Sequence, residues 1–280
     1  MDKVALVYQP AVEEALPLAR RCSEALCARG MHPILLPGGN LGGEPVPKDL
    51  RLVVTFGGDG TILRAAQWLA GSTVPVVGVQ MGRLGFLAEL MPADLPDGLG
   101  PYLDGQCWLD SRQMLEAWLG EAEGVSEGSA QSGPGQLLAL NDVVVGRGAS
   151  LRTVTVDLSV AGQLLHSFRC DGLIVATATG STAYSFAAGG PVLAPDAAQV
   201  VVTPICPHIS ALHSLVLPAD LPLHLQVWSS QPAVMTIDGQ VDFPLTNGQV
   251  VDTRISNAAT TFARGGTRAD LYRRILAKLA

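Results

Sequence analysis

One short stretch constrains the rest of the chain. In residues 53–63 an apolar, β-branched run leads into Gly57, Gly58, Asp59 and Gly60 and then into a helix-forming sequence. Such a run predicts a buried parallel strand, and the glycines permit the sharp turn that follows it. The first turn of the next helix offers free N–H groups and positive partial charge, which suit phosphate oxygens. The stretch therefore predicts a strand, a phosphate-binding turn and a helix.

Asp59 is the unexpected residue in this turn, because a carboxylate repels the anion that the surrounding backbone would bind. It needs a task that compensates for the repulsion, such as holding a metal ion or taking a proton. The alternative is a tight turn with a capping aspartate, since glycine and aspartate both favour turns. The stretch matches neither the P-loop with its Lys-Ser/Thr nor the dinucleotide-binding Gly-x-Gly-x-x-Gly pattern.

The Gly-Gly-Asp-Gly-Thr sequence around Asp59 resembles the signature shared by NAD kinases, 6-phosphofructokinases, diacylglycerol kinases and sphingosine kinases. The resemblance implies a kinase that transfers the terminal phosphoryl group of a nucleotide to a hydroxyl. It implies that Asp59 is catalytic and that Gly57, Gly58, Gly60 and Thr61 form the phosphate-donor loop. The signature alone does not name the acceptor.

Length and composition limit the remaining possibilities. A chain of 280 residues, 48% of them apolar, can bury one large core or two ordinary ones. The net charge of −7 argues against nucleic acid or an anionic membrane surface as the main partner. With only three lysines, charge that faces phosphates would come mostly from arginine. Five scattered cysteines indicate no disulfide framework and no close-spaced metal cluster, which fits a reducing cytoplasmic setting.

The first part of the chain has the pattern of an α/β domain. The N-terminal apolar run is too short for a signal peptide, and no run approaches the about 20 apolar residues of a membrane span. Predicted strands and helices alternate at residues 4–8, 12–29, 34–36, 52–56, 62–70 and 74–79. This alternation indicates a doubly wound parallel sheet, in which ligands bind beyond the C-terminal ends of the strands.

The pattern changes in residues 92–105, which are rich in proline, glycine and aspartate. Later residues form β-rich runs at 143–145, 153–160, 163–169, 223–229 and 234–237. Residues 121–136 are rich in glycine, serine and glutamate and predict a flexible hairpin insertion. We therefore expect an α/β domain over residues 1–97 and a β-rich domain over residues 98–262. An amphipathic C-terminal helix would return to the first domain, which residues 263–280 complete.

The loop at residues 80–87 follows a predicted strand and is similar to the NAD-kinase segment Asn-x-Gly-x-Leu-Gly-Phe-Leu. Gln80 stands where that family usually has asparagine, which leaves the role of its side chain open. We expect Leu84 and Phe86 to pack in the core. Because this loop and Asp59 both follow strand ends of one parallel sheet, they should lie at the same edge.

Asn141 and Asp142 precede another predicted strand, and an adjacent amide and carboxylate can together hold a sugar diol. The pair resembles the Asn-Glu/Asp segment with which NAD kinases grip a ribose. A plain turn before a strand explains the local sequence equally well. Arg152, by its place after this segment, is a further candidate for contact with an anion.

Residues 171–185 carry the most specific resemblance, to the NAD-kinase signature Asp-Gly-(apolar)-Thr-Pro-Thr-Gly-Ser-Thr-Ala-Tyr-Ser, with Ala178 in place of the proline. The resemblance implies that Asp171 lies by the nicotinamide end of NAD. Arg169 stands where the family often carries lysine or histidine, and its charge suits a pyrophosphate, although a surface arginine is an equal alternative. The nucleoside pocket is implied to include Thr179, Thr182, Ala183, Tyr184, Ser185, Phe186 and Ala187.

The segment Asp238-Gly239-Gln240 alone predicts a hairpin turn. In its place after a β-rich run it resembles the Asp-Gly-Gln of the same family, whose glutamine contacts the dinucleotide. His208 and His213 have no third candidate ligand nearby, so we read them as structural residues.

These motifs, in this order, thus extend the resemblance to NAD kinases over nearly the whole chain. It implies that ATP, or another phosphoryl donor, phosphorylates the 2′-hydroxyl of the adenosine ribose of NAD and gives NADP. NAD would bind between the domains, with its ribose at Asn141 and Asp142 and with Asp59 and Gly60 at the reacting hydroxyl. A divalent metal, expected to be Mg²⁺, would balance charge on the donor phosphates without a side-chain motif of its own. The family resemblance also implies a homodimer or homotetramer.

Two alternatives remain. A kinase of the same superfamily that acts on a lipid or a sugar phosphate would explain residues 57–61 but not residues 171–185. A dinucleotide-binding protein without catalysis would not need the carboxylate of Asp59. An assay with NAD, diacylglycerol and fructose 6-phosphate as acceptors would separate these possibilities.

Overall fold

The structure is a computed structural model that describes residues 2–82, 85–120, 137–150, 152–208 and 212–279. The insertion expected at residues 121–136 and the side chain of Leu84 lie outside these described residues. In the part of the chain that is described, no helix is long and apolar enough to cross a membrane. The chain divides into two compact units, which are Met1–Arg112 with Ala259–Ala280 (unit 1) and Gln113–Ala258 (unit 2).

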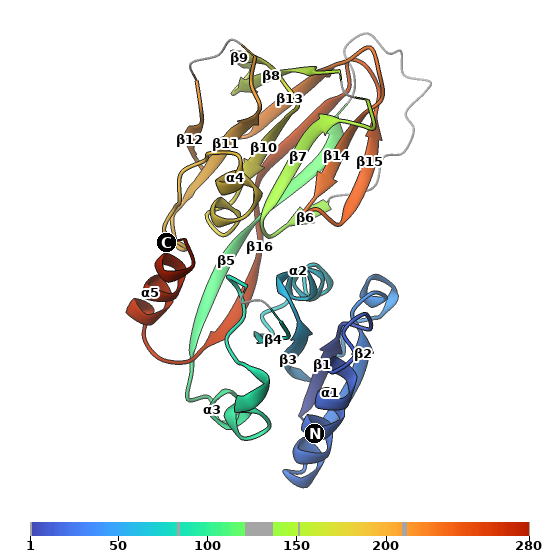
Figure 1. Cartoon of the computed structure of the whole chain (residues 1–280), viewed down its shortest axis with the longest axis vertical. Coiled ribbons are helices and arrows are strands. Elements are labelled where there is room, and N and C mark those ends of the chain that lie inside the picture. The colour runs from blue at the N-terminus through green and yellow to red at the C-terminus, as the bar shows by residue number, and fades with distance from the viewer. Residues whose placement is uncertain (1, 83–84, 121–136, 151, 209–211, 280) are drawn as a thin grey trace. The chain divides into compact units, whose positions relative to one another are not determined.

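Unit 1 is the expected α/β domain (Figure 1). Its parallel sheet has the strand order β2-β1-β3-β4. The last residues of β16 extend the sheet through the pair Phe262 and Val76. Strands of unit 1 are β1 (Lys3–Tyr8), β2 (His32–Pro37), β3 (Leu50–Gly57) and β4 (Val76–Gln80). Its helices are α1 (Ala15–Ala28), α2 (Asp59–Trp68), α3 (Gly100–Leu103) and α5 (Arg268–Leu279).

The core of unit 1 follows directly from the sequence pattern. The middle of β3 and all of β4 are buried on both faces, as apolar β-branched strands in a parallel sheet should be. Helix α1 buries Leu18, Cys22 and Leu26, which lie one helical turn apart on a single face. The strand order reverses direction at β1, so the edge beyond β1 and β3 is the position where such sheets bind ligands.

Unit 1 extends to Arg112, whereas the sequence pattern places the boundary at residue 97. The proline- and glycine-rich segment at residues 92–105 belongs to unit 1, because Leu99 and Leu103 pack into its core. Strands β5 (Trp108–Gly120) and β16 (Val250–Arg264) each run from one unit into the other. The boundaries of the compact units therefore fall inside strands.

Unit 2 contains two antiparallel sheets with a shared apolar core. One has the order β12-β11-β10-β7-β14-β15, and the other contains β16-β13-β8-β9. Alternate residues of the facing strands, such as Val143 and Val145 of β7 and Val156 and Leu158 of β8, form that core. The remaining strands of unit 2 are β6 (Leu137–Ala139), β9 (Gln163–Cys170), β10 (Gly172–Ala176), β11 (Gln199–Ile205), β12 (Leu215–Pro218), β13 (Leu223–Trp228), β14 (Ala233–Ile237) and β15 (Val241–Leu245), with β7 at Asp142–Arg147 and β8 at Val154–Val160.

Candidate functional site

Asp59 is the first residue of α2, and only Gly58 separates it from the end of β3. The backbone N–H groups of Thr61 and Ile62 already bond to the carbonyl of Gly58, which closes the first helical turn. A Cβ at Gly57 would stand 2.2 Å from Oγ1 of Thr61, so only glycine fits there. Thr61 is buried against that glycine, whereas Asp59 is half-buried and Gly60 is exposed. The turn therefore leaves Asp59 and Gly60 accessible to a ligand and buries Thr61.

The carboxylate of Asp59 is held by the second loop of the same sheet edge. Its Oδ2 accepts the N–H of Phe86 at 2.7 Å, and its Oδ1 accepts the N–H of Leu87 at 3.2 Å. Because each carboxylate oxygen has a further lone pair, the group can still accept a hydrogen bond from a hydroxyl. The two loops after β3 and β4 therefore form one site, as their positions at strand ends predict.

Gln80 has a clear structural task in this site. Its side chain is buried, and its Oε1 accepts the N–H of Gly85 at 3.0 Å. A Cβ on Gly85 would lie 2.1 Å from Oδ1 of Asp59, so the loop approaches the carboxylate as closely as its backbone allows. Gln80 thus shapes the loop that holds Asp59.

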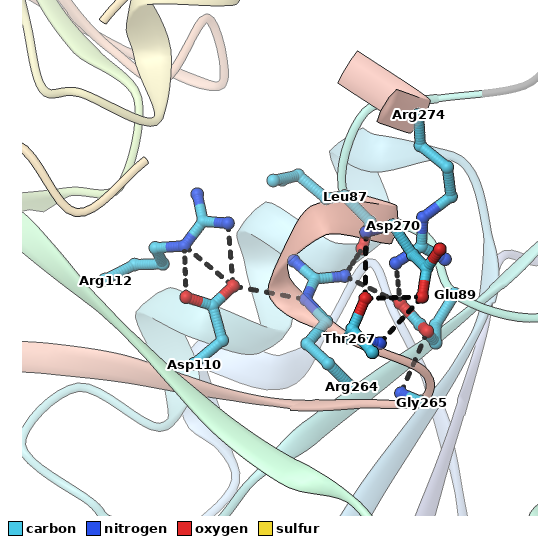
Figure 2. A network of polar contacts seen from close by, with 9 residues as sticks. All are labelled: Leu87, Glu89, Asp110, Arg112, Arg264, Gly265, Thr267, Asp270 and Arg274. Atoms are coloured by element: carbon cyan, nitrogen blue, oxygen red, sulfur yellow. Dashed lines mark hydrogen bonds and ion pairs between the residues drawn. The ribbon is translucent and has the colours of Figure 1, made fainter. Parts of the chain in front are cut away.

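A buried ionic network supports the same loop (Figure 2). Arg264 is 1% exposed and donates from Nη1 to the carbonyl of Leu87 at 2.7 Å. It also pairs with Glu89 at 3.3 Å and with Asp110 at 3.2 Å. Arg274 of α5 pairs with Glu89 at 2.9 Å, which attaches the C-terminal helix to the segment that follows β4. Leu87 therefore connects Asp59 to this network. Its N–H donates to Asp59, and its carbonyl accepts from Arg264.

Lys278, near the end of α5, adds positive charge beside Asp59. Its Nζ lies 5.4 Å from the centre of the Phe86 ring. Burial lowers the pKa of Lys278, and the charge of Asp59 opposes this effect. Phe86 is half-buried, short of the core position expected for it, and its ring is the face on which this ammonium rests.

Unit 2 contains a separate pocket of about 580 Å³. Five of the residues singled out in the sequence line it, from three different segments of the chain. They are Asn141, Asp142, Asp171, Ala183 and Tyr184. The pocket thus brings together Asn141, Asp142 and two parts of the hydroxyl-rich signature.

The hydroxyl-rich segment folds as a short 3-10 turn (Gly180–Thr182) followed by α4 (Tyr184–Ala187). Ser185 is fully buried, and its Oγ lies 3.0 Å from Oγ1 of Thr203. Thr179 is also buried, Thr182 is half-buried, and Tyr184, Phe186 and Ala187 are exposed. Several small residues of the signature therefore pack the turn and leave Tyr184 as the aromatic side chain at the pocket.

Arg152, Arg169 and Gln240 lie outside the lining of this pocket. Arg152 is exposed, and Arg169 lines a shallower depression with Thr153 and Trp228. Gln240 is half-buried at the end of the hairpin turn between β14 and β15. The turn itself is the one that the Asp-Gly pair predicts.

Two charged residues of the pocket lining, Arg147 and Asp238, were not among the predicted site residues. Arg147 pairs with Asp171 at 3.2 Å and so supplies the positive charge nearest to that carboxylate. Its place at the end of the strand that begins with Asp142 was the available signal. Asp238 was predicted as part of the hairpin turn and of the Asp-Gly-Gln segment, in which only Gln240 was given a contact, yet the Asp238 side chain is buried, with 7% exposure.

Burial, and secondly the charge of Asp238, raise the pKa of Asp142 to about 7. Around neutral pH this carboxyl therefore exists partly in its protonated form, which can donate as well as accept a hydrogen bond. Within the described residues no group of three or more His, Cys, Asp or Glu could hold a metal ion. A metal ligated by phosphates would need only one or two carboxylates from the protein, and Asp59 fits that need.

An α/β unit with a glycine-rich, carboxylate-bearing turn at its strand ends, joined to a β-rich unit with a polar pocket, defines a kinase of the nucleotide-dependent phosphoryl-transfer class. The model of the ATP-NAD kinase N-terminal domain matches residues 41–106, and that of the ATP-NAD kinase C-terminal domain matches residues 140–265. The chain belongs to the ATP-NAD kinase family, and phosphorylation of NAD is the activity that this membership assigns to it.

Individual relatives agree with this assignment. The chain is 40% identical to an NAD kinase of Dehalococcoides mccartyi over 83% of its own length and 79% of that protein. It is 34% identical to an NAD kinase of Chloroflexus aggregans over 100% of its length and 99% of that protein.

Two solved structures share the fold. An NAD kinase from Archaeoglobus fulgidus in complex with ATP matches with a TM-score of 0.77 and 25% identity, over 98% of this chain and 99% of that one. The yeast NADH kinase complexed with NADH has a TM-score of 0.83 and 22% identity, over 100% and 87% of the two chains. The expected combination of an α/β domain, a β-rich domain and a C-terminal helix is confirmed.

Proposed function

We propose that the chain transfers the terminal phosphoryl group of ATP to the 2′-hydroxyl of the adenosine ribose of NAD. The observation that carries the proposal is the carboxylate of Asp59, fixed by two backbone N–H groups at the strand ends and still able to accept a hydrogen bond. A free hydroxyl is a poor nucleophile and a carboxylate is a weak base. In a loose phosphoryl-transfer transition state, however, positioning and charge stabilisation dominate.

Each motif then has a role. Asn141 and Asp142 hold the ribose diol, and the face of Tyr184 stacks on a base of NAD. Asp171, paired with Arg147, lies toward the nicotinamide end.

At the donor side, the backbone of Gly57, Gly58 and Gly60 at the start of α2 receives phosphate oxygens. Arg152, Arg169 and Gln240 remain proposed NAD contacts on the family resemblance alone, as do Thr179, Thr182, Ser185, Phe186 and Ala187.

We propose Mg²⁺ as the divalent metal, held by the donor phosphates and at most by Asp59. Bound in this way, it would neutralise charge on the transferred phosphoryl group. We also propose a homo-oligomer, since Leu164, Leu165 and Val216 are exposed apolar side chains on edge strands β9 and β12. None of the five cysteines forms a disulfide, which supports a cytoplasmic setting.

A matrix of phosphoryl donors and acceptors tests the proposal. ATP with NAD should give NADP, whereas diacylglycerol and fructose 6-phosphate should not be phosphorylated. Asp59→Asn should reduce turnover by roughly 10²–10⁴-fold, the usual contribution of a general base, while NAD binding measured by calorimetry persists. Turnover of this variant within a few-fold of wild type would make Asp59 a turn residue and overturn the catalytic assignment.

A further inference from the structure

Asp238 occupies an unusual position in unit 2. It follows β14 in the three-residue turn to β15, with φ of +50° at Asp238 and +64° at Gly239. Both values are those of a hairpin turn that asparagine or glycine would make equally well. A turn of this kind does not require a carboxylate, and turn side chains usually face solvent. The side chain of Asp238 is instead buried.

The buried carboxylate of Asp238 accepts three backbone N–H groups from one segment. These come from Leu140 at 3.0 Å, Asn141 at 2.7 Å and Asp142 at 3.1 Å. In return, the N–H of Asp238 donates to the carbonyl of Asp142 at 3.0 Å. Three N–H donors favour the ionised carboxylate, because hydrogen bonds to a charged acceptor are the strong ones.

The opposite side of the same segment is held by the hydroxyl-rich signature. Oγ1 of Thr177 donates to the carbonyl of Leu140 at 2.6 Å, and its N–H donates to the carbonyl of Asn141 at 2.9 Å. A Cβ on Gly180 would stand 2.0 Å from the carbonyl oxygen of Asn141. The backbone of the segment is thus fixed from both sides, while Asn141 and Asp142 line the pocket.

We propose that Asp238 is a positioning residue for the acceptor nucleotide: its carboxylate fixes the backbone of Asn141 and Asp142, and its charge adds to burial in favouring the protonated form of Asp142, which donates a hydrogen bond to the ribose. This proposal rests on the proposed function, because it takes Asn141 and Asp142 as the ribose site. The proposal gives Asp238 a role of its own. The family resemblance gives a contact only to Gln240 of the same Asp-Gly-Gln segment.

Electrostatics support the second half of the proposal. Burial comes first and Asp238 second among the causes that raise the pKa of Asp142 to about 7. The other charged groups that line the pocket, Arg147 and Asp171, pair with each other, and Tyr184 is the remaining titratable group. A protonated Asp142 can donate to a ribose oxygen and adds no negative charge near the pyrophosphate of NAD. NAD affinity should therefore fall as pH rises through about 7.

The test uses Asp238→Asn in the full chain, with NAD dissociation constants measured by calorimetry between about pH 5.5 and 8.5. Asparagine has a single acceptor oxygen without charge, so the dissociation constant should rise roughly 10- to 100-fold at pH 7. The pH at which affinity falls should also move downward, since Asp142 loses its charged neighbour. Asp220→Asn, whose exposed side chain lies outside the pocket lining, is the matched control and should leave both quantities unchanged.

A folded Asp238→Asn protein with the wild-type affinity and pH profile would overturn the proposal. If that variant does not fold, Asp142→Asn decides the second half, because the pH-dependent step must disappear when the titrating group is removed. A step that persists in Asp142→Asn overturns the proposal. If Asp142→Ala weakens NAD binding and Asp238→Asn does not, the present inference fails alone. If neither variant affects NAD binding, the ribose assignment of the proposed function fails as well.

Discussion

The backbone N–H of Phe86 donates to the carboxylate of Asp59 over 2.7 Å, although the two residues are 27 positions apart. This bond joins the loop after β4 to the start of α2, and Leu87 adds a second bond to the other oxygen. A carboxylate fixed at both oxygens keeps one orientation, so it can align a hydroxyl without first losing its own conformational freedom. The glycine that precedes Phe86 is what allows this approach.

Gly85→Ala should therefore abolish most activity without a large loss of stability. The new Cβ would stand 2.1 Å from Oδ1 of Asp59, a separation that forces the loop or the carboxylate to move. We expect turnover to fall at least 10²-fold, because small misplacements of reacting groups carry penalties of this size. Steady-state kinetics and thermal unfolding would be measured together.

Gly39→Ala is the control for that substitution, because a Cβ there meets no atom within 4 Å. It should retain wild-type turnover. Normal activity in Gly85→Ala would show that the contact between the loop and Asp59 is unimportant for the reaction.

Tyr184→Ala should weaken NAD binding and leave the fold intact. The side chain is 48% exposed and lines the pocket of unit 2, so its removal leaves no buried cavity. Stacking of a base on an aromatic ring is worth roughly 1–3 kcal/mol, used here by analogy with nucleic-acid complexes. Calorimetry should show NAD affinity reduced about 5- to 150-fold, with the melting temperature unchanged. Tyr272→Ala, with 37% exposure on α5, should not alter NAD affinity; equal effects in both variants would contradict the stacking role.

Much of this fold could be predicted from local sequence. The buried β-branched runs gave the parallel strands, and their alternation with helices gave the class of unit 1. The Asp-Gly pair at residues 238–239 gave a hairpin turn. These features depend on near neighbours in the chain, which is why periodicity and turn chemistry detect them.

The contacts that make the sites could not be predicted in the same way. Asp238 and Asn141 are 97 residues apart, and no local rule relates a turn carboxylate to a distant backbone N–H. Likewise, Ser185 is buried with its hydroxyl against Thr203, a residue of another segment that the signature around Ser185 does not specify. A serine or threonine that contacts a ligand cannot be distinguished by sequence from one whose hydroxyl is buried within a turn.

The raised pKa of Asp142 predicts how stability depends on pH. In the unfolded chain this carboxyl titrates near its ordinary value of about 3.9, whereas in the folded chain it titrates at about 7. Between these values the folded state binds the extra proton, so the free energy of unfolding falls as pH rises. Above about pH 7 the contribution of this group no longer changes.

Asp142→Asn should lack this fall, because its side chain does not titrate. The melting temperature of wild type minus that of Asp142→Asn should decrease from pH 4 to pH 7 and then level off. The same difference measured for the exposed Asp220→Asn should stay flat. A difference that is constant over this range for Asp142→Asn would show that the carboxyl is ionised in the folded protein throughout.

The last prediction concerns Arg264, whose guanidinium connects the support of Asp59 to the C-terminal helix. Arg264 bonds to the carbonyl of Leu87, and it shares Glu89 with Arg274 of α5. Arg264→Met would leave Asp110 and Glu89 buried with less positive charge. Removing one partner of a buried ionic network typically costs about 3–5 kcal/mol, so the melting temperature should fall by several degrees. Because Leu87 also donates to Asp59, turnover per folded molecule should fall as well.

Arg273→Met provides the matched control on the same helix. Arg273 is 76% exposed and pairs only at the surface with Asp270, where an ion pair contributes about 0–1 kcal/mol. Unfolding in urea and steady-state kinetics should therefore distinguish the two variants, with Arg273→Met close to wild type in both. Equal stability of the two variants would mean that the buried network is dispensable. A destabilised Arg264→Met protein with full turnover at low temperature would mean that Leu87 holds Asp59 without help from Arg264.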